Sequence, residues 1–211
     1  MDSSKNKLIK MELVSTNSQK KLVKSIIEKY HSYVPTNNSV GRRIDWLIYQ
    51  VDDDYNENVF PPYGEKECVG MIGIGSGVYP PPKDILTELN LSKNEYKDCF
   101  NSFSNNWRFC MIKKIPNAGT KILKKLRKLA PIEWKNKYKD ELKYIVTFVA
   151  GGNNGAVYKA DNWNMIGQTS GLPSNRKSVS MKWNTSSELK QNYCKPTGEN
   201  KKLIFLKKLK K

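Results

Sequence analysis

The stretch that decides the fold is Leu142 to Gly171, LKYIVTFVAGGNNGAVYKADNWNMIGQTSG. Its first eight residues form a nearly continuous apolar and β-branched run, which is the pattern of a strand covered on both faces. Gly151 to Asn154 break this run and supply a helix N-cap, so we expect a short helix that begins near Gly155 and carries Tyr158. The next strand follows at 163–169. The stretch therefore predicts a strand, helix and strand that close an α/β sheet.

A candidate cofactor site lies upstream of this unit. Residues 108–115 alternate as a strand, Pro116 to Gly119 form a tight turn, and an amphipathic helix is expected over 120–130. This order places free backbone N–H groups and the positive end of a helix dipole at the end of the strand, where a pyrophosphate can bind. An ordinary turn between strand and helix is the alternative. The predicted cofactor-binding residues are Ile115, Asn117, Ala118, Gly119 and Thr120.

The remaining elements complete a recognisable order. An amphipathic helix is predicted over 18–33, and apolar strands over 44–51 and 68–78 are joined by an acidic, turn-rich segment. Helix, antiparallel strands, strand, phosphate-type turn, helix, strand, helix and strand is the arrangement of the acyl-CoA N-acyltransferase (GNAT) fold. We therefore expect a single-domain α/β GNAT-like fold with a mixed, mostly antiparallel sheet flanked by helices. Fold alone does not fix function.

The domain boundaries follow from composition. Residues 1–17 are polar and are expected to form a loose lead-in, and 18–171 form the GNAT-like domain. The segment 79–106 is an insertion in which 85–91 and 96–103 suggest short helices. Residues 172–211 are expected to be a basic C-terminal arm that ends in a strand, with another candidate strand at 178–183.

The charge of the chain points to a polyanionic partner. The 211 residues contain 37 Lys and Arg against 20 Asp and Glu, a formal net charge of +17. The excess is concentrated in 108–139 and in the last eleven residues, which predicts binding to DNA or RNA. A solvated lysine-rich face is the alternative, and a membrane surface is a weaker one. The predicted nucleic-acid-binding residues are Arg42, Arg43, Lys121, Lys124, Lys125, Lys128, Arg176 and Lys177.

The cysteines and the hydropathy suggest a cytoplasmic protein. The four cysteines have no short paired spacing, so neither a zinc knuckle nor a disulfide framework is indicated. The first thirty residues have no apolar core of a signal peptide, and no apolar run reaches the length of a membrane helix.

Several strings resemble phage-related families. NGAVYKADNWNMIGQTSG at 154–171 is similar to the signature of the Mom-type phage DNA-modification family and to the DruA component of the Druantia anti-phage system. YHSY at 30–33, VGRRIDWLIYQ at 40–50, VGMIGIGSGVY at 69–79 and NNWRFCMIKKIPN at 105–117 also resemble DruA. The resemblance implies nucleic-acid chemistry with an acyl-CoA donor, iron as a further candidate cofactor, and other phage or defence-system proteins as partners.

The candidate catalytic residues are His31, Tyr33, Tyr158 and Asn162. The resemblance places His31 where Mom-type proteins carry a functional histidine, as a base for an exocyclic amine or as a metal ligand, although one histidine is a weak metal site. Tyr33 could supply a hydroxyl or stack on a base. In the acyltransferase arrangement the phenol of Tyr158, with a pKa of about 10, can protonate the departing CoA thiolate. Asn162 could bind an adenine edge. Structural roles are the alternative for all four.

One position departs from the resemblance. Both families commonly have an acidic residue where this chain has Ala150, so either Asp161 substitutes for it or the chemistry is altered. The sequence thus predicts a base-modifying acyltransferase acting on DNA or RNA. The alternatives are an inactive nucleic-acid-binding subunit of a defence complex and a protein or small-molecule N-acetyltransferase.

Overall fold

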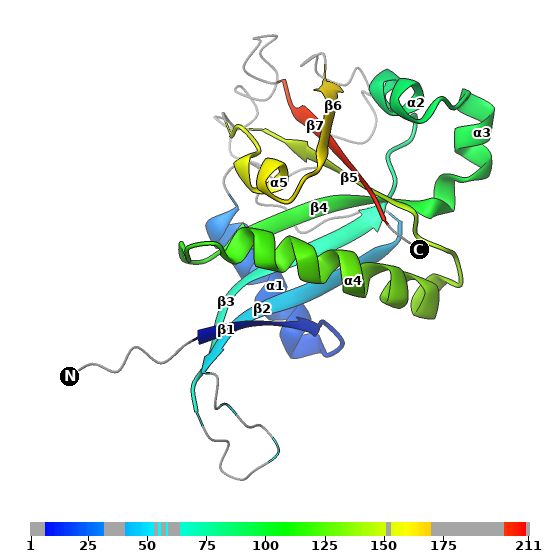
Figure 1. Cartoon of the computed structure of the whole chain (residues 1–211). Helices are drawn as coiled ribbons and strands as arrows, with labels where there is room; N and C mark the ends of the chain where they lie inside the picture. Colours follow the sequence, from blue (N-terminus) through cyan, green and yellow to red (C-terminus); the bar gives the residue numbers. More distant parts are fainter. Residues whose placement is uncertain are drawn as a thin grey trace, which may run out of the picture.

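The computed structural model describes residues 7–31, 41–52, 55, 58, 64–150, 153–169 and 201–209. These residues form a seven-stranded sheet with helices on both faces (Figure 1). The order of strands across the sheet is β1-β2-β3-β4-β5-β7-β6, and only the β4–β5 pair is parallel among the pairs of this described sheet. The strands are β1 (Lys7–Leu13), β2 (Arg43–Asp52), β3 (Lys66–Ser76), β4 (Phe103–Met111), β5 (Tyr144–Val149), β6 (Asn164–Gln168) and β7 (Leu203–Lys208). The helices are α1 (Asn17–Tyr30), α2 (Lys83–Leu89), α3 (Lys93–Asp98), the 3-10 turn η1 (Phe100–Ser102), α4 (Ala118–Tyr138) and α5 (Ala156–Ala160).

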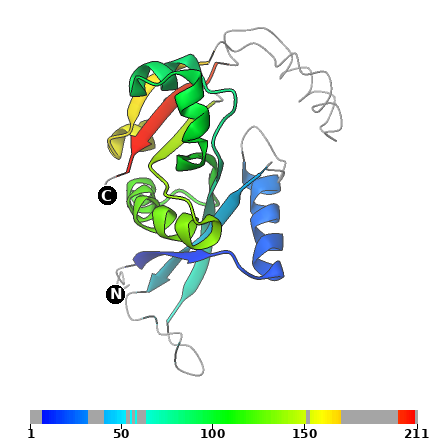
Figure 2. The same cartoon turned by 90° about the vertical axis from the view of Figure 1, so that its right-hand side faces the viewer.

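The helices divide between the two faces of the sheet, as Figure 2 shows for α1 and α4. On one face, Val23, Ile26 and Ile27 of α1 pack on Leu47 and Met71. On the other face, a larger core joins α4 and α5 to the strands, and its helix members include Ile122, Leu126, Trp134 and Tyr158. Burial of these apolar stripes holds the helices against the sheet.

The expected loose lead-in is wrong for residues 7–13. These residues form β1, which pairs with β2 along its whole length, from Lys7↔Asp52 to Leu13↔Trp46. The sequence pattern did not predict this strand, because β1 is an edge strand with one well-buried residue, Ile9, while Leu8 and Leu13 are exposed. Charged residues on such an edge discourage pairing with other chains.

Helix α4 is longer than predicted. It begins at Ala118 and runs to Tyr138, with Pro131 inside it, whereas the prediction covered 120–130. The missing N–H of Pro131 removes one helical hydrogen bond. Trp134 holds the part of α4 that follows Pro131 against the core. Its ring is fully buried, and its Nε1 donates to the carbonyl oxygen of Asn101 at 3.1 Å.

The predicted insertion at 79–106 is shorter than expected. It contains α2, α3 and η1, and β4 already begins at Phe103 rather than at residue 108. Its buried side chains, Ile85, Tyr96 and Phe103, form a core with Val146 and Ile204. These helices therefore cover the β5–β7 part of the sheet.

The described residues at the C-terminal side, 201–209, belong to the sheet, whereas residues 172–200 of the predicted arm lie outside the described residues. The expected strand is present as β7, but it lies between β5 and β6 and is antiparallel to both. Ile204 and Phe205 are fully buried in it. The candidate strand at 178–183 lies outside the described residues. Among the residues that are described, no helix is long and apolar enough to cross a membrane.

Candidate active site

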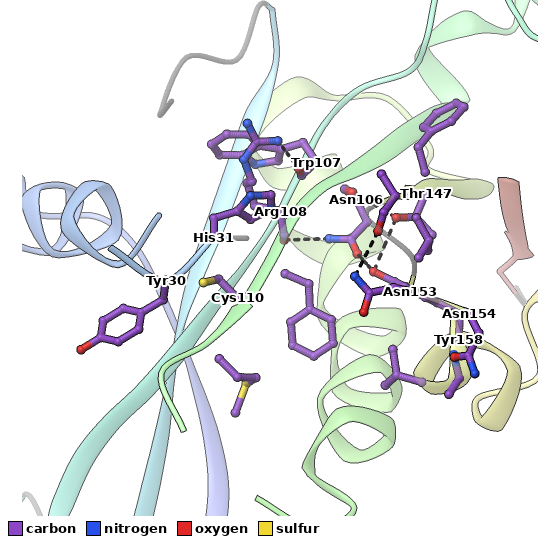
Figure 3. Close-up of a pocket in the computed structure, with 18 residues that line it drawn as sticks. Tyr30, His31, Asn106, Trp107, Arg108, Cys110, Thr147, Asn153, Asn154 and Tyr158 are labelled. Atoms are coloured by element: carbon purple, nitrogen blue, oxygen red, sulfur yellow. Dashed lines mark hydrogen bonds between the residues drawn. The ribbon is translucent and has the colours of Figure 1, made fainter. Parts of the chain in front are cut away.

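Strands β4 and β5 separate in the middle of the sheet. Their parallel pairing consists of Phe103↔Tyr144, Ser104↔Ile145 and Asn105↔Val146, although β4 continues to Met111 and β5 to Val149. A cavity of about 390 Å³ lies where they part, and residues of β4, β5, α5 and the end of α1 line it (Figure 3).

A β-bulge in β4 stands at the point of separation. The pairs Gly73↔Arg108 and Gly75↔Asn105 leave one residue of β3 opposite two residues of β4, Asn106 and Trp107. An extra residue bends the bulged strand and increases its twist. The bend turns the rest of β4 away from β5 and opens the cavity.

Tyr158 reaches the cavity from α5. Its hydroxyl donates to Oδ1 of Asn106 at 2.8 Å, and Oγ1 of Thr147 lies 3.5 Å from the same hydroxyl. Its ring packs on Trp163 and Phe205 with centroids 5.1 and 5.6 Å away. The predicted candidate acid is therefore held by its ring, with its hydroxyl among the cavity residues.

Gly155 lets α5 sit this close to the sheet. It caps the helix with φ 69°, and a Cβ at this position would overlap the ring of Phe205. The left-handed conformation and the close approach both require glycine.

His31 lines the same cavity from the end of α1, and Figure 3 shows it and Tyr158 on opposite sides of Asn106. Burial, and next the guanidinium of Arg108, lower the pKa of His31 from 6.5 to about 4. The imidazole is thus neutral at pH 7 and only a weak base. Tyr33 lies outside the described residues.

This pKa can be measured directly because His31 is the only histidine of the chain. We expect its imidazole NMR signals to titrate near pH 4. Because the unfolded chain binds the proton near pH 6.5 and the folded protein does not, the wild type should lose stability as pH falls from about 6.5 to 4. Thermal melts of His31→Gln should show a smaller loss over this range. A titration midpoint near 6.5 would contradict the buried, cation-flanked environment.

The described residues do not offer a metal centre around His31, the candidate metal ligand. Within the described ranges, no group of three or more His, Cys, Asp and Glu side chains could hold a metal ion. We derive no step of the chemistry through iron.

The predicted pyrophosphate cradle forms the start of α4. Asn117 precedes the helix with φ 57°, the N–H of Ala118 donates to the carbonyl oxygen of Ile115 at 3.3 Å, and the first turn contains no acid. Gly119 has a packing reason of its own, because a Cβ there would overlap Cγ2 of Val157. Since Val157 also lines the cavity, the start of α4 adjoins it.

Asn162 and Asp161 do not line the cavity. Asn162 has φ 56° and is not among the cavity-lining residues, and its carbonyl oxygen accepts from Nζ of Lys207 at 2.7 Å. The Asp161 carboxylate accepts from Nε and Nη2 of Arg127 at 3.0 and 2.6 Å, and from Nε1 of Trp163 at 2.9 Å. Asp161 therefore does not substitute for the acid absent at Ala150, which itself lines the cavity.

The structure divides the predicted nucleic-acid-binding residues. Arg42 pairs with Asp140 at 2.6 Å and stacks over Tyr138, and Arg43 pairs with Asp45 and stacks over Trp107. These two arginines therefore hold the fold. The four predicted lysines of α4, Lys121, Lys124, Lys125 and Lys128, are all exposed. Arg176 and Lys177 lie outside the described residues.

Asn106, Arg108 and Thr147 are polar cavity residues that the sequence analysis did not name as site residues. Asn106 was assigned to the insertion, and the other two to strands. The one local signal in the sequence is the amide of Asn106 next to the predicted strand at 108–115, and a polar residue there is equally typical of a strand end.

Comparison with known proteins shows the fold. No family model matches the chain, and no curated protein matches it either. Among solved structures, Arabidopsis thaliana NAA60 in complex with acetyl-CoA is 12% identical, with a TM-score of 0.54 over 96% of this chain and 99% of that one. The same plant protein in complex with a bisubstrate analogue is 12% identical, with a TM-score of 0.51 over 95% and 98% of the two chains.

The fold is that of the GNAT acetyltransferases. This confirms the predicted fold class. The comparisons support neither membership of the Mom-type or DruA families nor an iron cofactor.

Proposed function

We propose that this protein is an acyl-CoA-dependent N-acyltransferase whose acceptor is an amine of a nucleic-acid base. The observation that carries the acyl-transfer proposal is the hydroxyl of Tyr158 held inside a cavity between separating strands. The cavity is lined from the α1 side by Tyr30 and His31 and from the α5 side by Val157 and Tyr158. Donor and acceptor can therefore approach the same point from opposite faces of the sheet.

The acyl-CoA donor fits beside the start of α4. The start of α4 offers backbone N–H groups and the positive end of a 21-residue helix to a pyrophosphate, next to Val157. In the reaction the acceptor nitrogen attacks the thioester carbonyl carbon, the C–S bond breaks, and the sulfur leaves with the electron pair. The sulfur takes the proton of the Tyr158 hydroxyl, and the proton lost by the acceptor nitrogen returns to the phenolate through solvent.

The cavity suits an amine that is uncharged before the reaction. Of the described residues that line it, Arg108 is the one that carries a charge at neutral pH, and none has a carboxylate. An ammonium group would meet a cation and find only His31, a weak base, to remove its proton. The exocyclic amine of a nucleobase is unprotonated at pH 7. The net charge of +17 and the exposed lysines of α4 further favour a polyanionic acceptor.

The second candidate is a nucleic-acid-binding subunit without catalysis. Ala150, in place of the acid expected there, favours it. A protein or small-molecule amine as acceptor is the third candidate.

Acetyl-CoA and a DNA or RNA oligonucleotide separate these functions. A ligand at a hundred times its Kd stabilises a protein by about 2.7 kcal/mol, so millimolar acetyl-CoA should raise the melting temperature clearly. Mass spectrometry of nucleosides from oligonucleotides incubated with protein and acetyl-CoA should detect an added acetyl group. DNA binding without an acetyl-CoA shift would favour the binding subunit. An acetyl-CoA shift without affinity for nucleic acid would favour another acceptor.

The lysines of α4 give a second test of the acceptor. If they contact phosphates, the slope of log K against log salt should fall by about 0.9 for each duplex contact that is lost. We expect a smaller slope for the variant with Lys121, Lys124, Lys125 and Lys128 all changed to Gln. A matched control changes four exposed lysines of α1 and α3 to Gln and removes the same charge: Lys20, Lys21, Lys93 and Lys97. Equal slopes for the two variants would show that the α4 lysines are only a solvated face.

A further inference from the structure

Asn106 is the residue through which the bulge and the Tyr158 hydroxyl are connected. Its Nδ2 donates to the carbonyl oxygens of Gly73 at 2.8 Å and Arg108 at 3.0 Å. Its Oδ1 accepts from the Tyr158 hydroxyl at 2.8 Å. The residue is 5% exposed, and its bonds to Gly73 and Tyr158 are buried.

These bonds fix which end of the amide faces Tyr158. Both hydrogens of the NH₂ group are used by backbone carbonyls of β3 and β4, which cannot accept from a carbonyl oxygen. The orientation with Oδ1 toward Tyr158 is therefore the one that satisfies the buried groups. Because Oδ1 can only accept, the phenol keeps its proton and points it at a defined place in the cavity wall.

Thr147 supplies the complementary contact. Its Oγ1 lies 3.3 Å from the carbonyl oxygen of Asn106 and 3.5 Å from the Tyr158 hydroxyl, and the residue is 3% exposed. One hydroxyl hydrogen can serve only one of these acceptors well. Once Tyr158 has given up its proton, its oxygen is anionic and is the stronger acceptor for the Thr147 hydroxyl.

We infer that Asn106 is a positioning residue that holds the Tyr158 hydroxyl, protonated, until the leaving thiolate forms. The O–H bond then rotates away from Oδ1 of Asn106 and its proton passes to the sulfur, while the Thr147 hydroxyl turns to donate to the phenolate. The inference rests on the proposed acyl transfer. It explains why a buried amide occupies the bulge that opens the cavity: the same residue closes the hydrogen bonds of the bulge and orients the acid.

A double-mutant cycle tests whether Asn106 acts through Tyr158. Asn106→Ser and Thr147→Val are each made in the wild type and in Tyr158→Phe. Thr147→Val is nearly isosteric and guards against a folding defect of Asn106→Ser. A misplaced catalytic group can cost about a hundredfold, so we expect kcat of Asn106→Ser to fall by about that factor while KM for acetyl-CoA stays within about twofold. Thr147→Val should lower kcat by about tenfold, as for loss of one hydrogen bond of about 1.4 kcal/mol.

In the Tyr158→Phe background neither substitution should lower kcat further, because the hydroxyl that they serve is already gone. Ser104→Ala is the control: Ser104 is buried on the same strand, its Oγ has no hydrogen-bond partner among the described residues, and it does not line the cavity. It should keep wild-type kcat. Full additivity with Tyr158→Phe, a rise in KM instead of a fall in kcat, or wild-type kcat in both single variants would overturn the inference alone. Absence of acyl transfer by the wild type would overturn the proposed function together with it.

Discussion

Tyr158→Phe should lower the rate of acyl transfer by about a hundredfold to ten-thousandfold, the usual cost of losing one acid–base group. The ring packs on Trp163 and Phe205 and remains in the variant, so the cavity keeps its shape. The melting-temperature shift with acetyl-CoA should therefore persist, and transfer should be followed by release of free CoA thiol together with mass spectrometry of the acceptor.

The substitution also leaves Oδ1 of Asn106 without its donor, which costs about 1–3 kcal/mol of stability. Tyr96→Phe is a matched control for this cost. The Tyr96 hydroxyl donates to the carbonyl oxygen of Val78 at 3.0 Å, its ring is fully buried, and it does not line the cavity. Both variants should lose stability, and only Tyr158→Phe should lose transfer. Equal activity in the two variants would remove Tyr158 from the chemistry.

Asp161→Ala should give the largest loss of stability among the changes considered. The variant deprives Arg127 of two hydrogen bonds and Trp163 of one. Breaking a buried ion pair costs about 3–5 kcal/mol, and we expect about 3 because Arg127 is 30% exposed while the Asp161 side chain is 7% exposed. For a chain of this size that corresponds to a fall in melting temperature of roughly 6–12 °C.

Asp161→Ala should keep its activity when it is assayed well below its melting temperature, because the carboxylate lies outside the cavity. Asp98→Ala removes an exposed acid of α3 and should change the melting temperature by little. If folded Asp161→Ala instead lost transfer by more than tenfold, the carboxylate would have a part in the chemistry that its pairing with Arg127 does not suggest.

Local pattern was sufficient for the elements that are buried on both faces. The apolar runs of β2, β3 and β5 and the helically spaced leucines of α4 were recognised directly, since each supplies a continuous row of buried side chains. The glycine and asparagine residues before α5 likewise placed Tyr158 on a short helix after a buried strand. The order of these elements alone predicted the GNAT fold class.

The pattern failed where non-local contacts decide the outcome. The exposed edge strand β1 exists because β2 offers it a full row of hydrogen-bonding partners. Residues 203–208 form β7 because pairing with both β5 and β6 buries Ile204 and Phe205. A run of four apolar residues between lysines does not show which strands it will pair with.

The candidate site shows the same division. The sequence by itself determined that Tyr158 lies on a short helix after β5, because the start of that helix depends on the residues next to it in the chain. Only the tertiary structure decided that Asn106, 52 residues away in the chain, accepts a hydrogen bond from the Tyr158 hydroxyl. It likewise decided that the Asp161 carboxylate pairs with Arg127, 34 residues away. Hydrogen-bond partners of buried polar groups are chosen by how the strands and helices pack, and a single bulge in β4 shifts which side chain meets which.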